Sequence, residues 1–326
     1  MEQTNKAPLG IILGPTASGK TSLGVQVAKR LGGEVISADS IQIYRGLDIG
    51  SAKPTREEME GVPHHMLDVA EVDGAKFSVA AYQQQATDII RRLQQAHIFP
   101  LVVGGTGLYI SALTSPLDFT ETPGDETLRQ ALQAQEQREP GSLYAKLQQE
   151  DPASAQRLHP NDIKRIVRAL EVKQLTGKPI GAAFSQTASA PCPYALTMVG
   201  LTMPRPLLYA RIEQRVDQML EQGLVEEARS IWEKGLDPAL PALQGLGYKQ
   251  LFAYFAGNTS LEAAVAAIKQ ETRHFAKRQM TWFRRDARIH WLDITQYTPE
   301  ALVDMACGLF RKEAVSYTHL RAHETT

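Results

Sequence analysis

The chain has 326 residues, 43% of them hydrophobic and 22% charged, and a formal net charge of −1 at pH 7. This size and composition indicate a globular protein of one large domain or two ordinary ones, and the near-zero charge limits any nucleic-acid surface to a local patch. The two cysteines, Cys192 and Cys307, exclude a disulfide framework and a Cys-based zinc site, and they favour a reducing, cytoplasmic setting. We find no signal peptide and no apolar run long enough to span a bilayer, so no membrane association is expected.

The first functional motif is a complete G-x-x-x-x-G-K-[ST] phosphate-binding loop at residues 14–21. An apolar run at 9–13 precedes it and a helical pattern at 21–31 follows it, which is the strand–loop–helix context that the motif requires. In such loops the backbone N–H groups converge on phosphate oxygens, the lysine adds a positive charge, and the last hydroxyl can bind Mg²⁺. The sequence therefore predicts a diphosphate or nucleotide site, with Thr21 as metal ligand, made by Gly14, Pro15, Thr16, Ala17, Ser18, Gly19, Lys20 and Thr21.

The first hundred residues alternate between predicted strands and predicted helices. Strands are expected at 9–13, 35–38 and 99–103, and helices at 21–31 and 78–96. This alternation predicts a parallel sheet covered by helices on both faces, an α/β fold of the P-loop NTPase-like kind. Ligands of such sheets bind at the carboxyl ends of the strands, so the residues that follow each strand form the candidate site.

The middle of the chain has a different composition. Residues 117–187 carry Gln-, Glu- and Arg-rich helical patterns at 125–139, 143–150 and 162–175, without strand-like runs. A strand pattern returns at 196–202, so we predict a helical insertion domain at 117–187 between two parts of one α/β core, 1–116 and 188–313. In the second part we expect helices at 205–234, 260–285 and 299–312, a turn at 244–249 and a last strand at 289–292. Residues 314–326 lack caps and periodicity and are predicted to be a non-native, disordered tail.

Two of the predicted strands are followed by residues suited to a ligand site. Asp39 follows the second strand, where a carboxylate can act as a general base or join a metal shell, although Asp39 or Ser40 could instead cap the next segment. The third strand ends in Gly104 and Gly105 and not in the acidic residue usual in motor ATPases, which counts against nucleotide hydrolysis but little against a small kinase. The Gly-Gly-Thr-Gly run fits either close approach of a ligand to the backbone or a tight turn.

Cationic residues gather in three places. Arg211 and Arg215 share one face of a predicted helix, where they could stabilise charge on a diphosphate or simply face solvent. Residues 273–285 hold five Lys or Arg residues and three aromatic residues, and the insertion carries Lys164, Arg165 and Arg168. Basic residues interleaved with aromatic ones suit single-stranded RNA. Each patch alone is more typical of a surface helix, but two of them in a near-neutral protein favour nucleic acid.

Taken together and in this order, these motifs resemble those of the tRNA dimethylallyltransferases, also called tRNA isopentenyltransferases. The resemblance covers roughly residues 8 to 312, and the ordered set is far more specific than any single motif except the loop. Its parts are GPTASGKT at 14–21, ISADS at 36–40, YRGLDIGSAKP at 44–54, PHHMLD at 63–68, GGTGLY at 104–109, HPND at 159–162, RIVRALE at 165–171, GYK at 247–249 and TRHFAKRQMTWF at 272–283.

The resemblance implies transfer of a dimethylallyl group from dimethylallyl diphosphate to the exocyclic amine of the adenosine 3′-adjacent to the tRNA anticodon, with release of diphosphate. It implies that Asp39 accepts the amine proton, that Thr21 and Arg215 contact the diphosphate, and that Mg²⁺ is the cofactor. It further implies that the insertion grips the anticodon stem-loop, and we expect the protein to be a monomer. The tRNA-binding residues implied are Asp39, Ser40, Ile41, Gln42, Thr106, Arg129, Lys164, Arg165, Ile166, Val167, Arg168, Gln244, Gly245, Leu246, Gly247, Tyr248 and Lys249.

Three other functions use the same loop. A small-molecule kinase would bind ATP there and use Asp39 to activate a hydroxyl, but it leaves the insertion and the basic-aromatic helix unexplained. An isopentenyltransferase acting on free adenine nucleotides would share the core without needing two RNA-facing patches. An NTP-dependent RNA-binding switch would leave Asp39 and the arginine pair without a role.

Overall fold

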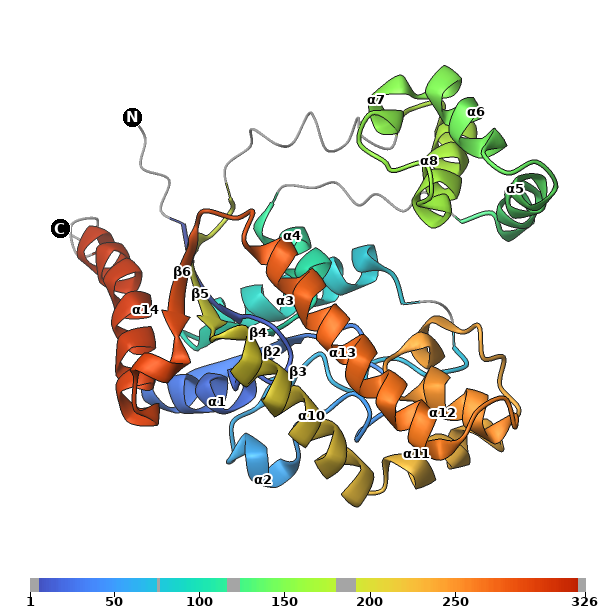
Figure 1. Ribbon diagram of the computed structural model, residues 1–326. Helices are drawn as coiled ribbons and strands as arrows, with labels where there is room; N and C mark the ends of the chain where they lie inside the picture. The colour runs from blue at the N-terminus through green and yellow to red at the C-terminus, as the bar shows by residue number, and fades with distance from the viewer. Residues whose placement is uncertain (1–5, 75–76, 116–123, 180–191, 322–326) are drawn as a thin grey trace. The chain divides into compact units, whose positions relative to one another are not determined.

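The structure is a computed structural model that describes residues 6–74, 77–115, 124–179 and 192–321, the last without the side chains of 313–321. Contacts divide the chain into a large unit, Met1–Thr114 with Pro193–Thr326, and a small unit, Ser115–Cys192. The predicted insertion, 117–187, falls inside the small unit. Each unit is described by itself (Figure 1).

The large unit is built on one six-stranded sheet with the order β3-β2-β4-β1-β5-β6. All neighbouring strands are parallel, and β1 pairs on one side with β4 and on the other with β5, which follows the insertion in the chain. The predicted α/β fold with a parallel sheet is therefore confirmed. The strands are β1 (Pro8–Leu13), β2 (Gly33–Ala38), β3 (His64–His65), β4 (Phe99–Gly104), β5 (Ala195–Thr202) and β6 (Ile289–Asp293).

Helices cover both faces of this sheet (Figure 1). On one face, α1 (Lys20–Leu31) and α14 (Pro299–Arg321) bury Val27 and Phe310 against side chains of the sheet such as Ile12. On the other face, α3 (Val79–Gln95) and α4 (Gly107–Thr114) pack Tyr82 against Tyr109 with ring centroids 3.8 Å apart. A short helix, α2 (Arg56–Met59), lies in the connection between β2 and β3.

A third apolar cluster lies beyond the sheet and holds several helices of the second half of the chain. It includes Ile43, Val216, Leu224 and Tyr248. The elements of this cluster are α10 (Arg205–Glu221), α11 (Leu224–Trp232), η1 (Pro241–Gln244), α12 (Tyr248–Phe255) and α13 (Leu261–Phe283). A short helix, η2 (Ile294–Gln296), follows β6.

Three expectations about this half differ from the structure. The single helix predicted at 205–234 is two helices, because Gly223 adopts a left-handed conformation with φ of +101° and separates α10 from α11. The turn predicted at 244–249 contains the end of η1 and the start of α12. Helix α14 continues to Arg321, where a tail was predicted from residue 314, and 322–326 lie outside the described residues. Within the described ranges, no helix is both long and apolar enough to cross a membrane.

The small unit is helical, with its own buried core. Its core includes Leu132, Leu147, Ile166 and Leu170. The Asp125 carboxylate caps α5 by accepting a hydrogen bond from the amide of Leu128 at 2.9 Å. The helices are α5 (Glu126–Arg138), α6 (Ser142–Glu150), α7 (Pro152–Ala155) and α8 (Ile163–Thr176).

Gly104 provides a direct test of how closely the strands approach at the end of β4. A Cβ atom at this position would lie 2.3 Å from the carbonyl oxygen of Ala38 on β2. We expect Gly104→Ala to lower the free energy of unfolding by about 1–3 kcal/mol, the usual cost of overpacking. Gly308→Ala is the matched control, because a Cβ atom there meets nothing within 4 Å and alanine favours helix by about 0.5–1 kcal/mol. Equal urea midpoints for the two variants would contradict this reading.

Candidate active site

A cavity opens where β1, β2 and β4 end, at the carboxyl edge of the sheet. Segments far apart in the sequence meet there, as expected for parallel α/β sheets. It brings together the three residues predicted to be catalytic, Thr21, Asp39 and Arg215. The lining residues are Thr16, Lys20, Thr21, Asp39, Gln42, Ser51, Ala52, Val103, Gly104, Gly105, Arg215, Phe275 and Gln279.

The predicted phosphate loop runs from the end of β1 into α1. Gly14 has a φ of +147°, and a Cβ atom on it would lie 2.8 Å from the carbonyl oxygen of Leu201, so this position needs glycine. The helix begins after Gly19 without a side-chain cap, which leaves the amides of its first turn for a ligand. The ammonium group of Lys20 donates a hydrogen bond to the carbonyl oxygen of Pro15 at 2.6 Å.

Asp39 is held by the backbone that follows it, and its two neighbours are held by Thr106. Its Oδ1 accepts hydrogen bonds from the amides of Ile41 at 2.9 Å and Gln42 at 3.3 Å. The next strand end ties down its neighbours, because the amide of Thr106 donates to the carbonyl of Ala38 at 3.0 Å and the Thr106 hydroxyl accepts from the amide of Ser40 at 3.0 Å. Thr106, predicted to lie near the substrate, thus supports the segment that carries the carboxylate.

The cavity carries two cations and one carboxylate. Burial, and to a smaller extent the nearby Arg215, lower the pKa of Lys20 to about 7, and Asp39 opposes both effects. Burial also lowers the pKa of Arg215, again opposed by Asp39. Positive charge that is poorly solvated and only partly balanced favours a bound anion. Arg211, expected on the same helix face as Arg215, is exposed and does not line the cavity.

Gln279 is a site residue that the sequence did not reveal. Its side chain is 6% exposed, and its Oε1 accepts from the amide of Thr16 at 2.9 Å. Its Nε2 donates to the carbonyl of Gly105 at 2.9 Å, so one amide group joins α13 to the phosphate loop and to the end of β4. The signal was a polar residue, able both to donate and to accept, within the run of cations on α13.

The four cationic residues of the small unit that were predicted to bind tRNA divide into two pairs. Arg129 and Arg168 lie 2.9 Å and 2.6 Å from the carboxylate of Glu171, which is fully buried. Lys164 and Arg165 are exposed on the first turn of α8. Ile166 and Val167, also predicted to bind tRNA, are buried in the core of the unit, so their side chains face inward. Of the predicted contacts in the small unit, Lys164 and Arg165 are therefore the exposed cations.

The segment from Gln244 to Lys249 divides in a similar way. Gln244 and Lys249 are exposed, whereas Tyr248 is fully buried and its hydroxyl donates to Glu227 at 2.7 Å. Gly245 and Gly247 are buried, and Leu246 is half-buried. Among the predicted contacts after β2, Ser40, Ile41 and Gln42 are each half-buried.

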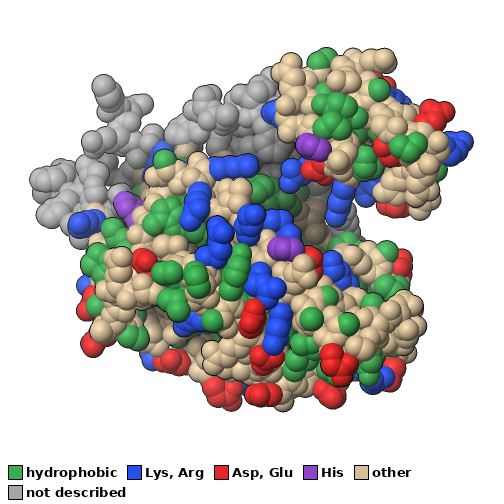
Figure 2. All heavy atoms as spheres, viewed as in Figure 1, with side chains coloured by type: hydrophobic (Ala, Val, Ile, Leu, Met, Phe, Trp, Pro, Cys, Tyr) green, Lys and Arg blue, Asp and Glu red, His purple; other side chains and the backbone are tan. Residues whose placement is uncertain are grey.

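Lys and Arg side chains gather on the face of the large unit that carries α13 (Figure 2). Of the cations on this helix and just after it, Lys277, Arg278, Arg284 and Arg285 are exposed. Trp282 lies among them with 39% of its surface exposed. The predicted combination of cations and aromatic groups is thus present on the surface, although Phe283 is buried in the core.

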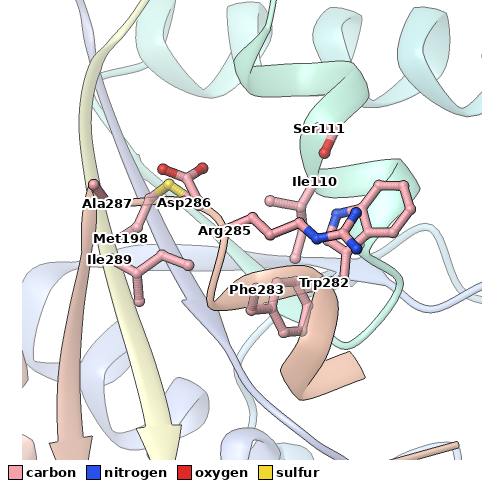
Figure 3. A pocket seen from close by; sticks show the side chains of 10 residues that line it. Ile110, Ser111, Met198, Trp282, Phe283, Arg285, Asp286, Ala287 and Ile289 are labelled. Atoms are coloured by element: carbon pink, nitrogen blue, oxygen red, sulfur yellow. The ribbon is translucent and has the colours of Figure 1, made fainter. Parts of the chain in front are cut away.

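A second cavity lies along the last turn of α13 and shares no lining residue with the first. Trp282 and Arg285 lie beside Ile110 and Ser111 of α4, and all four line the cavity (Figure 3). A Cβ atom on Gly107 would lie 2.3 Å from the ring of Trp282, so the indole packs directly on the backbone of α4. Met198 and Ile289 line the cavity from the strands β5 and β6.

Comparison with known proteins identifies the family. The model of the IPP transferase family matches residues 42–286. The chain belongs to this family. A tRNA dimethylallyltransferase of Pelotomaculum thermopropionicum is 49% identical over 295 residues, which cover 90% of this chain and 93% of the relative. One of Symbiobacterium thermophilum is 50% identical over 297 residues, covering 91% and 92%. The resemblance found in the motifs is thereby confirmed.

Solved structures agree with this membership. The full-length tRNA isopentenylpyrophosphate transferase of Bacillus halodurans matches with a TM-score of 0.74 at 41% identity, over 98% of this chain and 100% of that one. A eukaryotic dimethylallyltransferase acting on tRNA matches with a TM-score of 0.75 at 27% identity, over 88% and 74%. These structural neighbours have a P-loop NTPase-like fold. The fold predicted from the sequence is therefore confirmed.

The lowered pKa of Lys20 predicts proton uptake when an anion binds. A diphosphate beside the ammonium group raises this pKa from about 7, so at pH 8 a mostly neutral Lys20 gains about one proton on binding. Affinity for diphosphate therefore falls as the pH rises above 7. Calorimetry with inorganic diphosphate, in buffers of different ionisation enthalpy, measures the uptake. Lys20→Arg stays protonated and should lack the proton uptake that comes from Lys20. Equal proton uptake by both proteins would contradict a lowered pKa of Lys20.

Proposed function

We propose that this protein transfers a dimethylallyl group from dimethylallyl diphosphate to the exocyclic amine of the adenosine 3′-adjacent to the tRNA anticodon. The observation that carries the proposal is the cavity shared by Thr21, Asp39 and Arg215 at the end of the phosphate loop. Diphosphate is the leaving group, and the amine proton goes to the base. The N–C bond forms as the allylic C–O bond breaks, so atoms and charges balance.

The phosphate loop binds and stabilises the diphosphate. As the C–O bond breaks, negative charge builds on the diphosphate while positive charge spreads over the allyl group. The free amides at the start of α1, the Lys20 ammonium group and the Arg215 guanidinium face that negative charge. Each of these interactions is stronger with the departing diphosphate than with the ground-state substrate, because the negative charge grows during the reaction.

Mg²⁺ is the proposed cofactor, and the donor set fits it. The described part of the chain has no group of three or more His, Cys, Asp or Glu residues arranged to hold a metal ion. Mg²⁺ commonly keeps several waters and takes phosphate oxygens with one or two protein oxygens. The hydroxyl of Thr21 would supply a protein oxygen, and the ion would neutralise charge on the diphosphate.

Asp39 is the proposed base. Its Oδ1 already accepts two amide hydrogen bonds, which fix the carboxylate against the end of β2. A carboxylate is ordinarily a weak base. It suffices because the adenine amine becomes strongly acidic once it begins to bond to carbon. Before that, the carboxylate orients the amine by hydrogen bonding.

We further propose that the acceptor is held by the exposed cations of both units. Lys164 and Arg165 in the small unit, and Lys277 and Arg278 on α13, would contact the phosphates of the anticodon stem-loop. The target adenine must leave its stack to reach Asp39, at a cost of a few kcal/mol. The protein would act as a monomer in the cytoplasm, where tRNA is available.

Asp39→Asn tests the base. Asparagine keeps an oxygen for the amides of Ile41 and Gln42 but loses basicity, so we expect the single-turnover rate to fall by about 10²–10⁴. Affinity for tRNA should stay within about twofold, because the change leaves the cationic surface intact. Asp73→Asn, an exposed site, is the control and should keep the wild-type rate. Near-normal turnover of the Asp39 variant would refute this role.

Charge reversal in the small unit tests tRNA contact. Lys164→Glu with Arg165→Glu should weaken tRNA binding and make the dependence of log K on log salt less steep by about 1–2 units. The control is Arg91→Glu with Arg92→Glu, which reverses the same charge at two exposed positions of α3. An unchanged salt slope in the first variant would show that the small unit does not contact the tRNA backbone.

A further inference from the structure

Glu227 on α11 binds a loop that forms one wall of the candidate active site. Its Oε2 accepts from the amides of Asp48 at 3.0 Å and Ile49 at 2.8 Å. Its Oε1 accepts from the amide of Gly50 at 3.0 Å and from the hydroxyl of Tyr248 at 2.7 Å. Three consecutive backbone N–H groups therefore converge on one carboxylate that lies 177 to 179 positions farther along the chain.

The loop held in this way leads directly to Asp39. Ser51 and Ala52 line the cavity, and their carbonyl oxygens accept hydrogen bonds from Nε2 of Gln42 at 3.3 Å and 3.0 Å. The other end of that amide, Oε1, accepts from the hydroxyl of Ser37 at 2.9 Å. The backbone amide of Gln42 donates to the carboxylate of Asp39. Hydrogen bonds and short covalent segments of the loop and of Gln42 thus connect Glu227 to the proposed base.

The chemistry of the site favours a charged carboxylate at position 227. An ionised carboxylate only accepts hydrogen bonds, and each of its oxygens can accept two, which matches two pairs of donors. Such charge-assisted bonds are roughly twice as strong as neutral ones. A glutamine would turn its own N–H donors toward one of those pairs. Glu227 does not line the cavity, and three of its four hydrogen bonds hold the loop while the fourth comes from Tyr248.

Tyr248 and Gly50 close the arrangement. A Cβ atom on Gly50 would lie 2.6 Å from the Tyr248 ring, so the ring packs directly on the loop backbone. Burial raises the pKa of Tyr248, and the negative Glu227 raises it further, so the phenol keeps its proton and remains a donor. Tyr248 is fully buried, so it does not meet RNA directly although it belongs to a motif predicted to contact tRNA. Its bond to Glu227 gives it a structural role in that motif.

We propose that Glu227 is a positioning residue for the transfer reaction, holding the wall at residues 48–52 and, through Gln42, the carboxylate of Asp39. The inference rests on the proposed function for its kinetic consequence, although the placement of the loop can be measured without any turnover. A displacement of about 1 Å at a reacting group can lower a rate by up to about 10²-fold, so loss of this contact should lower kcat. The diphosphate site is built by other residues, so the KM for dimethylallyl diphosphate should not change.

Hydrogen exchange tests the placement of the loop independently of activity. In Glu227→Gln, the amides of Asp48, Ile49 and Gly50 should exchange at least about tenfold faster than in the wild-type protein. Glu226→Gln is the matched control, since it removes the same charge from the neighbouring, exposed position of α11. Equal exchange of the loop in the two variants overturns the proposal, whether or not the protein prenylates tRNA.

A double-mutant cycle tests the path to Asp39. We expect Glu227→Gln to lower kcat by about tenfold or more, with the KM for dimethylallyl diphosphate within about twofold of wild type. In a Gln42→Ala background the same change should cost less than about threefold, because the path is already broken. Fully multiplicative losses, or the same kcat as Glu226→Gln, overturn the proposal. A wild-type protein inactive on tRNA would instead refute the proposed function and leave the exchange result valid.

Tyr248→Phe covers the case in which Glu227→Gln does not fold. It removes one donor of four and leaves the carboxylate in place. The loop amides should then exchange about two- to threefold faster than in the wild-type protein. The kcat should also fall, by a smaller factor than expected for Glu227→Gln. A folded Tyr248→Phe protein with wild-type exchange in this loop and wild-type kcat overturns the proposal.

Discussion

The structure of the candidate site depends on one electrostatic constraint: Lys20 and Arg215 share a partly buried cavity with a single carboxylate, Asp39. Burial disfavours the charged forms of both cations, and they also repel each other. Under the proposed function, an anionic diphosphate would supply the missing negative charge. The carboxylate of Asp39 would then be left to interact with the acceptor amine. In this proposal one cavity binds the leaving group and holds the base.

Around this centre, polar side chains from distant segments fix the geometry. Gln279 joins the phosphate loop to the end of β4, Thr106 supports the backbone on either side of Asp39, and Glu227 holds the loop opposite. None of these side chains has to react. Each restricts the motion of a segment that carries a proposed reacting group. Such restriction raises the rate because the reacting groups are already in position. Two of the three come from the helices that follow β5, so the second half of the chain completes a site that the first half begins.

Much of the fold could be predicted because parallel strands buried on both faces are continuous apolar runs, and the phosphate loop marks one strand end. The two-residue β3 and the break at Gly223 have no comparable pattern. Gln279 could not be assigned either, because its bond to Thr16 spans 263 positions. The resemblance identified motifs correctly but did not indicate which way side chains point. Ile166, Val167 and Tyr248 are buried, and Arg129 pairs with the buried Glu171.

The most direct test of the central claim is a competition between acceptors. The purified protein would be incubated with Mg²⁺, dimethylallyl diphosphate, AMP and an unmodified tRNA that carries an A-A-A run starting at the last anticodon base. Mass spectrometry of the digested RNA and of the nucleotide pool would then locate any dimethylallyl adduct. We expect an adduct on the adenosine next to the anticodon and none on AMP. An adduct on AMP alone, or no adduct on either acceptor, would contradict the account.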